Sequence, residues 1–264
     1  MGDYNRDDAA SQSFGWEHDL PGPHDAPVTR PLASMLSPPN HIDETYMELP
    51  RATLQARGFG FWLIICVAPL IICFFLIYLG RRGMVPLGFM DLCLVAALAG
   101  GIYIFGYIWR MDMEAPVDEP IRFSRLRQKI YVYHFGYCGI NLFSRNKWGV
   151  FPKAYDWNNV RAEYCSAYGP MGTGGVAKFV NLLVVEPGTG KVLDRVFLAH
   201  GRLKGEMYWA MAQLYMQQGP EAIPKFDRPP RDWNNEVHFE NIARRFAPKV
   251  KWPDAMDLES RTAP

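Results

Sequence analysis

The stretch Phe61-Trp-Leu-Ile-Ile-Cys-Val-Ala-Pro-Leu-Ile-Ile-Cys-Phe-Phe-Leu-Ile-Tyr78 decides how this chain folds, because it runs about eighteen apolar residues without a charge. At about 1.5 Å of rise per residue, a helix of this length approaches the thickness of a bilayer's hydrocarbon core. A second apolar run, Leu92 to Trp109, follows after a short connection. The sequence therefore predicts a membrane helical hairpin over residues 59–110, with spans at about 60–79 and 90–109.

The connection between the runs, Gly80 to Gly88, is too short to hold a domain, so both termini are expected on one side of the membrane. Basic residues favour the cytoplasmic side. The connection offers Arg81 and Arg82, whereas the flanks offer seven basic residues: Arg51, Arg57, Arg110, Arg122, Arg125, Arg127 and Lys129. We therefore expect both termini in the cytoplasm. Neither run has a charge at its middle, which favours an anchor over a conduit for ions.

Whole-chain averages hide this division, since the formal net charge of +1 and the mean hydropathy of −0.12 resemble those of an ordinary soluble protein. Outside the hairpin, only Cys138 and Cys165 remain of five cysteines, and no spacing indicates a disulfide framework or a metal site. Residues 1–58 are predicted to form a disordered acidic tail with a short interfacial segment, because the tail is rich in proline and poor in apolar residues.

Short runs of β-branched and aromatic residues predict an antiparallel sheet in the next part of the chain. These runs are Ile121 to Ser124, Lys129 to Phe135, Gly139 to Phe143, Trp148 to Lys153, Val160 to Ala167, Phe179 to Glu186 and Val192 to Ala199. After Gly201, apolar residues recur at helical spacing until Gly219: Leu203, Met207, Ala210, Met211, Leu214 and Tyr215. We therefore expect an α+β domain over residues 120–220, in which a helix at 202–218 caps a curled sheet. A proline- and aromatic-rich arm over 221–264 should follow, lying over the domain and fraying after Pro253.

Parts of this domain resemble a bacterial pleckstrin-homology-like (PH-like) domain. The likeness is carried by Ile121-Arg-Phe-Ser-Arg125, Lys129-Ile-Tyr-Val-Tyr133, Tyr155-Asp-Trp-Asn-Asn-Val-Arg-Ala-Glu163, the Thr189 to Arg195 hairpin and the capping helix. With the hairpin and the tail, the chain resembles a family of proteobacterial two-helix membrane proteins that are often encoded near type VI secretion effectors. That resemblance implies a location in the bacterial inner membrane, and it implies an immunity protein that neutralises a secreted toxin.

No constellation for catalysis emerges from the sequence. Gly188-Thr-Gly-Lys191 lacks the first glycine of a phosphate-binding loop and carries Val192 where a magnesium ligand should stand. Neither a carboxylate pair nor a nucleophile with a matching histidine is apparent, and the histidines lack metal-ligand spacing. We therefore expect a protein that is not an enzyme, has no cofactor or metal, and does not bind nucleic acid.

Two surfaces are candidates for binding. The loops that carry Asn146, Lys147, Trp148, Gly172 and Gly174 are the predicted contacts for a protein partner. The basic residues Arg122, Arg125, Arg127 and Lys129 are the predicted contacts for anionic lipid, which attracts such residues near a cytoplasmic leaflet. A solvated sheet edge that also serves membrane topology and resists aggregation explains the same charges, and we favour this interpretation, although the two are compatible.

The sequence thus leads to two functional hypotheses. The first is a membrane-anchored, non-enzymatic protein-binding module, an immunity protein against a type VI secretion effector by resemblance. The second is a lipid-binding or membrane-organising module that uses the basic residues. Self-association of the hairpins is compatible with both hypotheses.

Overall fold

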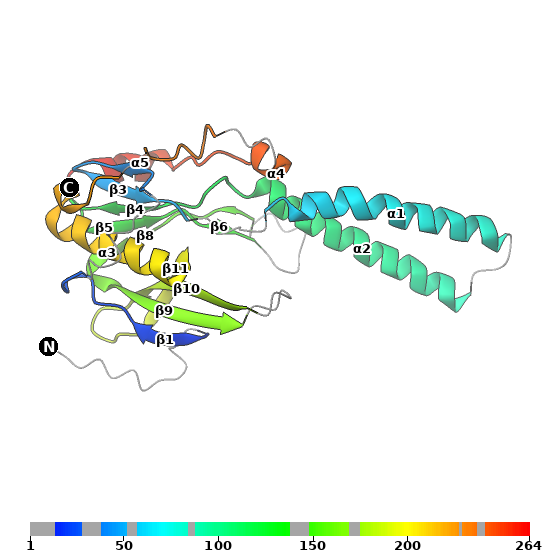
Figure 1. Ribbon diagram of the computed structural model, residues 1–264, viewed down its shortest axis with the longest axis horizontal. Coiled ribbons are helices and arrows are strands. Elements are labelled where there is room, and N and C mark those ends of the chain that lie inside the picture. The colour runs from blue at the N-terminus through cyan, green and yellow to red at the C-terminus, as the bar shows by residue number, and fades with distance from the viewer. Residues whose placement is uncertain are drawn as a thin grey trace.

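The computed structural model describes residues 14–27, 38–51, 57–83, 88–137, 148–168, 175–226, 229–236 and 241–264. A domain of β-sheets lies at one end of the molecule, and a helical hairpin projects from it (Figure 1). The hairpin consists of α1 (Phe59–Arg82) and α2 (Phe89–Glu114). Both helices are long and apolar enough to cross a membrane, as the sequence predicted, and neither apolar window is buried within the protein.

The two helices meet along a narrow seam. On each helix, half-buried positions recur every three or four residues, which places them on one face. On α1 these positions are Ile64, Ala68, Ile71, Phe75 and Tyr78, and on α2 they are Leu94, Leu98, Gly101, Phe105 and Ile108. Many other apolar side chains of the described parts of these helices are exposed, among them Leu70, Phe74 and Ile102. Such an exposed apolar surface suits a lipid environment.

The helices approach each other closely at Gly60, where an added Cβ would stand 1.8 Å from Cγ2 of Ile108. The small residues Gly100 and Gly101 of α2 make no comparable contact, because a Cβ at either position would meet nothing within 4 Å. The close contact at Gly60 therefore lies at the base of the hairpin, where the helices join the β domain.

Arg57 ties the hairpin to the domain by capping the end of α2. Its guanidinium donates to the carbonyl oxygens of Asp112 at 2.8 Å and Pro116 at 2.5 Å, and also to that of Ala115. These are acceptors that the end of a helix leaves without partners inside the helix. The carbonyl of Arg57 in turn accepts a bond from Asn241 Nδ2 at 2.8 Å. Arg57, counted above as a topology signal, is therefore buried and structural.

The β domain contains two separate larger sheets, so the prediction of one curled sheet is wrong. The first sheet has the antiparallel order β2 (His41–Ile42), β3 (Tyr46–Leu49), β4 (Ile121–Ser124), β5 (Lys129–Val132) and β8 (Lys153–Asp156). The second has the order β1 (Trp16–Asp19), β9 (Val160–Tyr168), β10 (Val176–Val185) and β11 (Val192–His200). A small pair joins β6 (Phe135–Gly136) to β7 (Gly149–Val150).

The described parts of the N-terminal region are folded, which contradicts the expectation of a disordered tail there. β3 pairs with β4 and buries Met47 and Leu49 fully, while β1 forms the edge of the second sheet. These segments gain their order from partners more than 70 positions away, as the pairing of Glu48 with Arg122 shows. The short strands thus complete sheets that the later sequence begins.

The core lies between the two sheets and around α3 (Arg202–Gln218), whose bounds agree with the predicted capping helix. This helix packs against β9, β10 and β11 and also touches β3 and β4. Trp209 of α3 lies against Trp157, with ring centroids 5.2 Å apart. Gly205 lets the helix approach the sheet, because an added Cβ would stand 2.3 Å from Val180. Leu203, expected on the apolar stripe, is instead 56% exposed.

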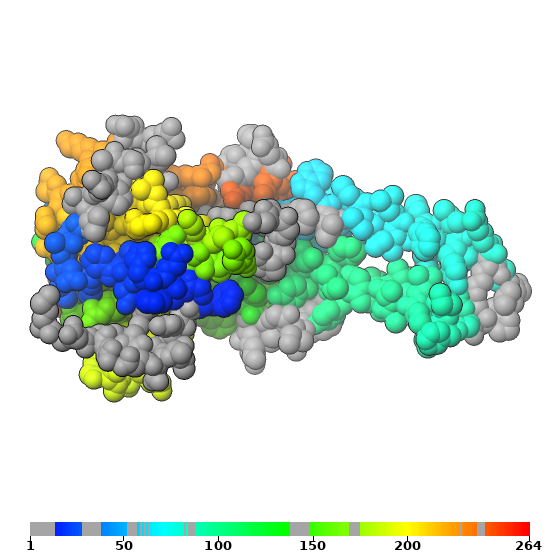
Figure 2. All heavy atoms as spheres, turned by 60° about the horizontal axis from the view of Figure 1, so that its bottom comes forward, coloured from blue at the N-terminus to red at the C-terminus, as the bar shows by residue number. Residues whose placement is uncertain are grey.

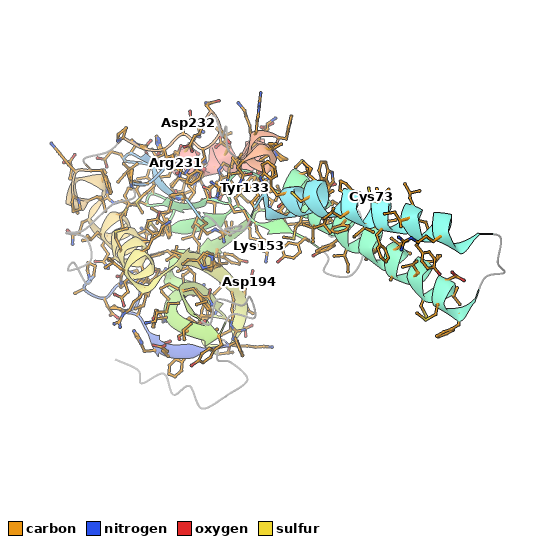
Figure 3. The ribbon with its side chains drawn as sticks, turned by 45° about the vertical axis from the view of Figure 1, so that its right-hand side comes forward. Cys73, Tyr133, Lys153, Asp194, Arg231 and Asp232 are labelled. Atoms are coloured by element: carbon orange, nitrogen blue, oxygen red, sulfur yellow. The ribbon has the colours of Figure 1, made fainter. Side chains whose placement is uncertain are left out.

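A polar link joins the two sheets at their facing edges. Lys153 of β8 donates to Asp194 of β11 at 2.5 Å, and the hydroxyl of Tyr155 also contacts that carboxylate. Figure 3 shows Lys153 and Asp194 side by side. The turn between β10 and β11 contains Gly188 and Gly190, both at positive φ, which confirms that the glycine-rich stretch is a hairpin turn.

The C-terminal arm covers the outer face of the five-stranded sheet. It includes α4 (Ile242–Arg245) and α5 (Asp254–Arg261), shown in orange and red in Figure 1. The sequence predicted an arm that frays after Pro253, and this prediction is wrong. The helix α5 forms because its carboxylates and Ser260 find basic partners on the sheet.

Candidate binding cleft

Strand alternation gives the five-stranded sheet an apolar inner face and a polar, aromatic outer face. The inner side chains belong to the core: Met47, Leu49, Ile121, Phe123, Ile130 and Val132. The outer side chains form a row beneath the C-terminal arm: Tyr46, Glu48, Arg122, Tyr131 and Tyr133. The outer face therefore combines charge with aromatic surface.

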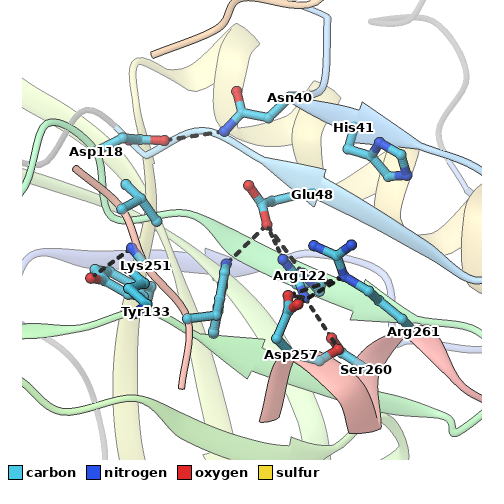
Figure 4. Close-up of polar contacts among 12 residues, drawn as sticks. Asn40, His41, Glu48, Asp118, Arg122, Tyr133, Lys251, Asp257, Ser260 and Arg261 are labelled. Carbon is cyan, nitrogen blue, oxygen red and sulfur yellow. Dashed lines mark hydrogen bonds and ion pairs between the residues drawn. The ribbon is translucent and has the colours of Figure 1, made fainter. Parts of the chain in front are cut away.

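Arg122 lies at the centre of this face (Figure 4). Its guanidinium donates to Glu48 Oε2 at 2.9 Å, to Asp257 Oδ1 at 2.8 Å and to Ser260 Oγ at 2.5 Å. The rings of Tyr46 and Trp252 lie 4.3 Å and 4.7 Å from the guanidinium carbon. With 3% of its surface exposed, Arg122 fastens α5 to the sheet and has no surface to offer to a lipid headgroup.

The other predicted lipid contacts are also engaged. Lys129 Nζ lies 2.9 Å from Glu259 Oε1, and this hydrogen bond lowers the pKa of the Glu259 carboxyl. Arg127 donates to the carbonyls of Thr262 and Ala263 at 2.8 Å and 2.9 Å. Arg125 pairs with Glu44 at 3.6 Å. Arg127 and Lys129 thus hold the C-terminal segment, and Arg125 pairs with the turn before β3, roles that could not be seen in the sequence.

A cleft opens where the arm crosses the outer face of the sheet, and its volume is about 570 Å³. Its walls hold three aromatic residues, four basic residues and five acidic residues: Tyr46, Trp233, Trp252, Arg122, Arg231, Lys251, Arg261, Glu48, Asp118, Asp232, Asp254 and Asp257. Asn40, next to β2, contributes a side-chain amide. We call this space the cleft.

Asp118 is the most perturbed acid of the cleft. Its carboxylate accepts bonds from the Arg51 N–H at 3.0 Å and from Asn40 Nδ2 at 3.3 Å. Only 4% of the residue is exposed, and burial raises its pKa to about 6. Arg51 lies behind it, donating to the carbonyls of Glu119, Tyr133 and Phe197 at 2.6, 2.7 and 2.9 Å. Asp118 is therefore a charge held in the protein interior beside an open cleft, which is typical of functional sites.

The rim of the cleft is set by Arg231 and Trp233. The Arg231 guanidinium carbon lies 4.0 Å above the Trp233 ring, and its nitrogens lie 2.5 Å and 2.7 Å from the two oxygens of Glu236. Trp233 Nε1 donates to Asn40 Oδ1 at 2.9 Å. Figure 3 shows Arg231 and Asp232 together on this side of the domain, far from Cys73 on the hairpin. The rim side chains are thus held in place before any partner arrives.

The structure places Trp148, a predicted partner contact, in the interior. Only 6% of it is exposed, and it packs with Phe135 and Tyr107 while Arg110 stands 4.4 Å from its ring. Trp148 joins α2 to β6 and β7, so it serves the junction with the hairpin. The other predicted partner contacts, Asn146, Lys147, Gly172 and Gly174, lie outside the described residues, as does Cys138.

The part of the chain that the structure describes contains no set of metal ligands. There, no group of three or more His, Cys, Asp or Glu side chains is arranged to hold a metal ion. The arrangement of the cleft suits recognition: it offers fixed charges of both signs and aromatic faces. The cleft has no local sequence signal, because it forms only when the outer positions of β3 and β4 contact the helix at 254–261.

Comparison with known proteins places the chain in a family. A family of unknown function, DUF6708, matches residues 98–264, which is more than half of the chain, and the protein belongs to this family. The matched region contains Arg122 and the whole C-terminal arm, whereas α1 and β1 to β3 lie outside it. No curated protein and no solved structure matches the sequence.

Proposed function

We propose that this member of the DUF6708 family is a membrane-anchored, non-enzymatic module that binds a protein partner in the cleft, at the cytoplasmic face of a bacterial inner membrane. The observation that carries the proposal is the lining of the cleft. Arginine, tryptophan and tyrosine dominate the energetics of protein interfaces, and here they gather around one space. The hairpin supports the anchoring part of the proposal.

The charges of the cleft favour a protein segment over a small apolar ligand. Pockets for small molecules are lined mainly by apolar side chains with a few polar groups. This cleft is lined by nine charged residues and three aromatic residues, and its rim is exposed at Arg231, Asp232 and Lys251. A partner segment with charged side chains that also packs on aromatic rings could form ion pairs with the charged residues of the cleft and contact its aromatic faces.

The rim is also organised in advance, which lowers the entropy cost of binding. Arg231 is fixed between Trp233 and Glu236, and Trp233 is fixed by Asn40. Confinement to the membrane by the hairpin would further restrict the search for a partner that acts at the same surface. Tight binding to a single partner is what neutralisation of a toxin requires.

The finer proposal is that the partner is a secreted toxin, and that the protein is an immunity protein against a type VI secretion effector. This part rests on the resemblance noted from the sequence. The lipid-binding alternative has less support, since Arg122 is buried and Arg127 and Lys129 hold the C-terminal segment.

Affinity capture from native membranes tests the proposal. The tagged chain is compared with a cleft variant, Arg231→Glu with Lys251→Glu, and with a control variant, Lys178→Glu with Lys191→Glu. Both double variants change the net charge equally, and all four positions are exposed. We expect one protein to be recovered with the wild type and the control, and at least about tenfold less of it with the cleft variant, because loss of a hot-spot arginine weakens binding strongly.

The immunity role is tested separately by producing the recovered protein with and without the intact chain. Growth arrest that the wild type relieves and the cleft variant does not relieve is the expected result. Equal recovery of all proteins by all three chains would contradict binding in the cleft. A partner that has no effect on growth would contradict the immunity role alone.

A further inference from the structure

A second surface of the domain already holds a peptide, and that peptide is the chain's own N-terminal segment. Residues 14–25, here called the resident segment, lie along β9 and α3. β1 is an edge strand that pairs antiparallel with β9, with Trp16 opposite Cys165 and Asp19 opposite Glu163. Figure 2 shows residues 14–27 as a dark-blue band on the surface of the domain.

Main-chain bonds flank this pairing. The Ser166 N–H donates to the Gly15 carbonyl at 2.6 Å, and the Leu20 N–H donates to the Ala162 carbonyl at 2.9 Å. The segment therefore extends the sheet by one strand, in the way that bound peptides extend sheets in β-augmentation. Without the segment, β9 would become an edge with unpaired main-chain groups.

Beyond β1, a row of donors on α3 holds the proline-containing part of the segment. Trp209, Gln213 and Gln217 are spaced four residues apart, so they share one face of the helix. Trp209 Nε1 donates to the Pro21 carbonyl at 2.8 Å, and Gln213 Nε2 donates to the Gly22 carbonyl at 2.5 Å. Gln217 Nε2 donates to the carbonyls of Pro23 and Asp25, both at 3.0 Å.

All of these acceptors are main-chain carbonyls, so the row recognises backbone and not particular side chains. Prolines suit such a row, because they keep a carbonyl acceptor and present no N–H. Side-chain contacts come from Leu20, which packs against the core, and from Pro23, which is buried. Two histidines add to them: the Nε2 atom of His24 lies 2.7 Å from Asn158 Oδ1, and the ring of His18 lies 5.1 Å from that of Tyr164. Glu17 and Asp19 face solvent.

The resident segment does not fill its groove. A space of about 260 Å³ remains between the segment and α3, lined by His18, Asp19, Leu20, Pro21, Arg202, Glu206, Trp209, Ala210 and Gln213. Arg202 and Glu206 form an ion pair at 2.7 Å at its border. The groove is thus larger than its occupant and has polar groups beyond those that the occupant uses.

We propose that the groove between β9 and α3 is a binding site for an extended peptide of another protein, a strand that ends in an aliphatic residue and a proline-bearing turn. The resident segment occupies this site in cis and is exchangeable. This inference concerns a surface different from the cleft, and it does not depend on the function proposed there.

An exchange experiment tests the proposal on the full chain in lipid nanodiscs. A protease site is inserted after Pro31, so that the protein folds before it is cut. Fluorescence anisotropy then measures binding of a labelled synthetic peptide of residues 14–25. We expect saturable binding to the cut chain and at least about tenfold weaker binding to the uncut chain, where the tethered segment competes at high effective concentration.

Matched variants test the mode of binding. Gln217→Leu removes two donated bonds and should weaken the peptide about tenfold, whereas Gln218→Leu, at the exposed neighbouring position, should leave binding unchanged. A peptide carrying Gly15→Val should not bind, because Gly15 has a φ of 74° and its Cβ would stand 2.1 Å from the Ser166 carbonyl oxygen. A peptide with Glu17→Thr and Asp19→Thr should bind within about threefold, because main-chain contacts dominate.

Several outcomes would overturn the proposal. Equal affinity for the cut and uncut chains would place the peptide elsewhere, and equal effects of Gln217→Leu and Gln218→Leu would exclude the donor row. Failure of the peptide with Glu17→Thr and Asp19→Thr to bind would show that the groove is specific to its own segment. If the resident segment exchanges only between two copies of the chain, and the protein has the mass of a dimer, the groove would be assigned to a second copy of the chain. If cutting unfolds the chain, failure of added peptide to restore its thermal transition would equally refute exchange.

Discussion

The buried carboxyl of Asp118 provides the sharpest test of the electrostatics at the cleft, through the substitution Asp118→Asn. Burial raises its pKa from 3.8 to about 6, so the folded state binds the proton more tightly than the unfolded state does. The resulting stability is fully present below pH 3.8 and is lost as the pH rises through about 6. At pH 8 the ionised carboxylate therefore costs about 3 kcal/mol of unfolding free energy.

The asparagine removes this cost and keeps an acceptor for the Arg51 N–H. It disturbs the bond from Asn40, which should cost about 1 kcal/mol. The net gain at pH 8 is about 2 kcal/mol, or about 4–8 °C in the midpoint of thermal unfolding for a domain of this size. Near pH 4 the variant should be equal to the wild type or slightly less stable.

Thermal unfolding of the protein in nanodiscs, followed by intrinsic tryptophan fluorescence between pH 4 and pH 8, measures this difference. Asp156→Asn, an exposed carboxylate at the end of β8, is the matched control and should change the midpoint little at any pH. A variant at Asp118 that is less stable than the wild type at pH 8 would refute the reasoning. An unchanged pH profile would refute it as well.

Three further substitutions test the framework that positions the cleft. Arg57→Ala leaves the carbonyls at the end of α2 without their donor, so we expect a loss of about 3 kcal/mol and faster trypsin cleavage between the hairpin and the domain. Arg122→Met removes the guanidinium that bonds Glu48, Asp257 and Ser260, although Glu48 keeps its bond from Trp252 and Asp257 keeps its bond from Arg261, so it should cost about 3 kcal/mol and release α5 to proteolysis. Arg125→Met, at a longer and more exposed ion pair, should cost less than about 1 kcal/mol. Gly60→Val should separate the hairpin helices and lower the free energy of unfolding by about 1–3 kcal/mol, which is measured as a lower thermal midpoint. Gly80→Val, in open space, should leave the midpoint unchanged. Equal effects of the two substitutions would contradict the packing described at the base of the hairpin.

The elements that could be predicted from the sequence are those whose signal is local. Two apolar runs predicted α1 and α2, and helical spacing predicted the bounds of α3. The run Ile121 to Ser124 coincides with β4, since alternation and turn residues mark a strand without reference to its partner.

What could not be predicted depends on partners far apart in the chain. Alternation shows which side chains share a face but not which strands pair, so the division into two sheets was missed. β1 looked disordered, because its stability comes from β9 nearly 150 positions later. Arg122 looked like a surface charge, because its partner Asp257 is 135 positions away. The cleft is therefore a product of tertiary structure, and no local motif announces it.

Site-specific photo-crosslinking in intact cells tests most directly the claim that the cleft binds a protein partner at the membrane. A photoreactive benzoylphenylalanine replaces Asp232, at the exposed rim of the cleft, or Lys191, at the turn between β10 and β11. We predict a single light-dependent adduct with one protein from position 232, recovered in the membrane fraction and missing from position 191. No adduct at position 232, or the same adducts from both positions, would contradict the account.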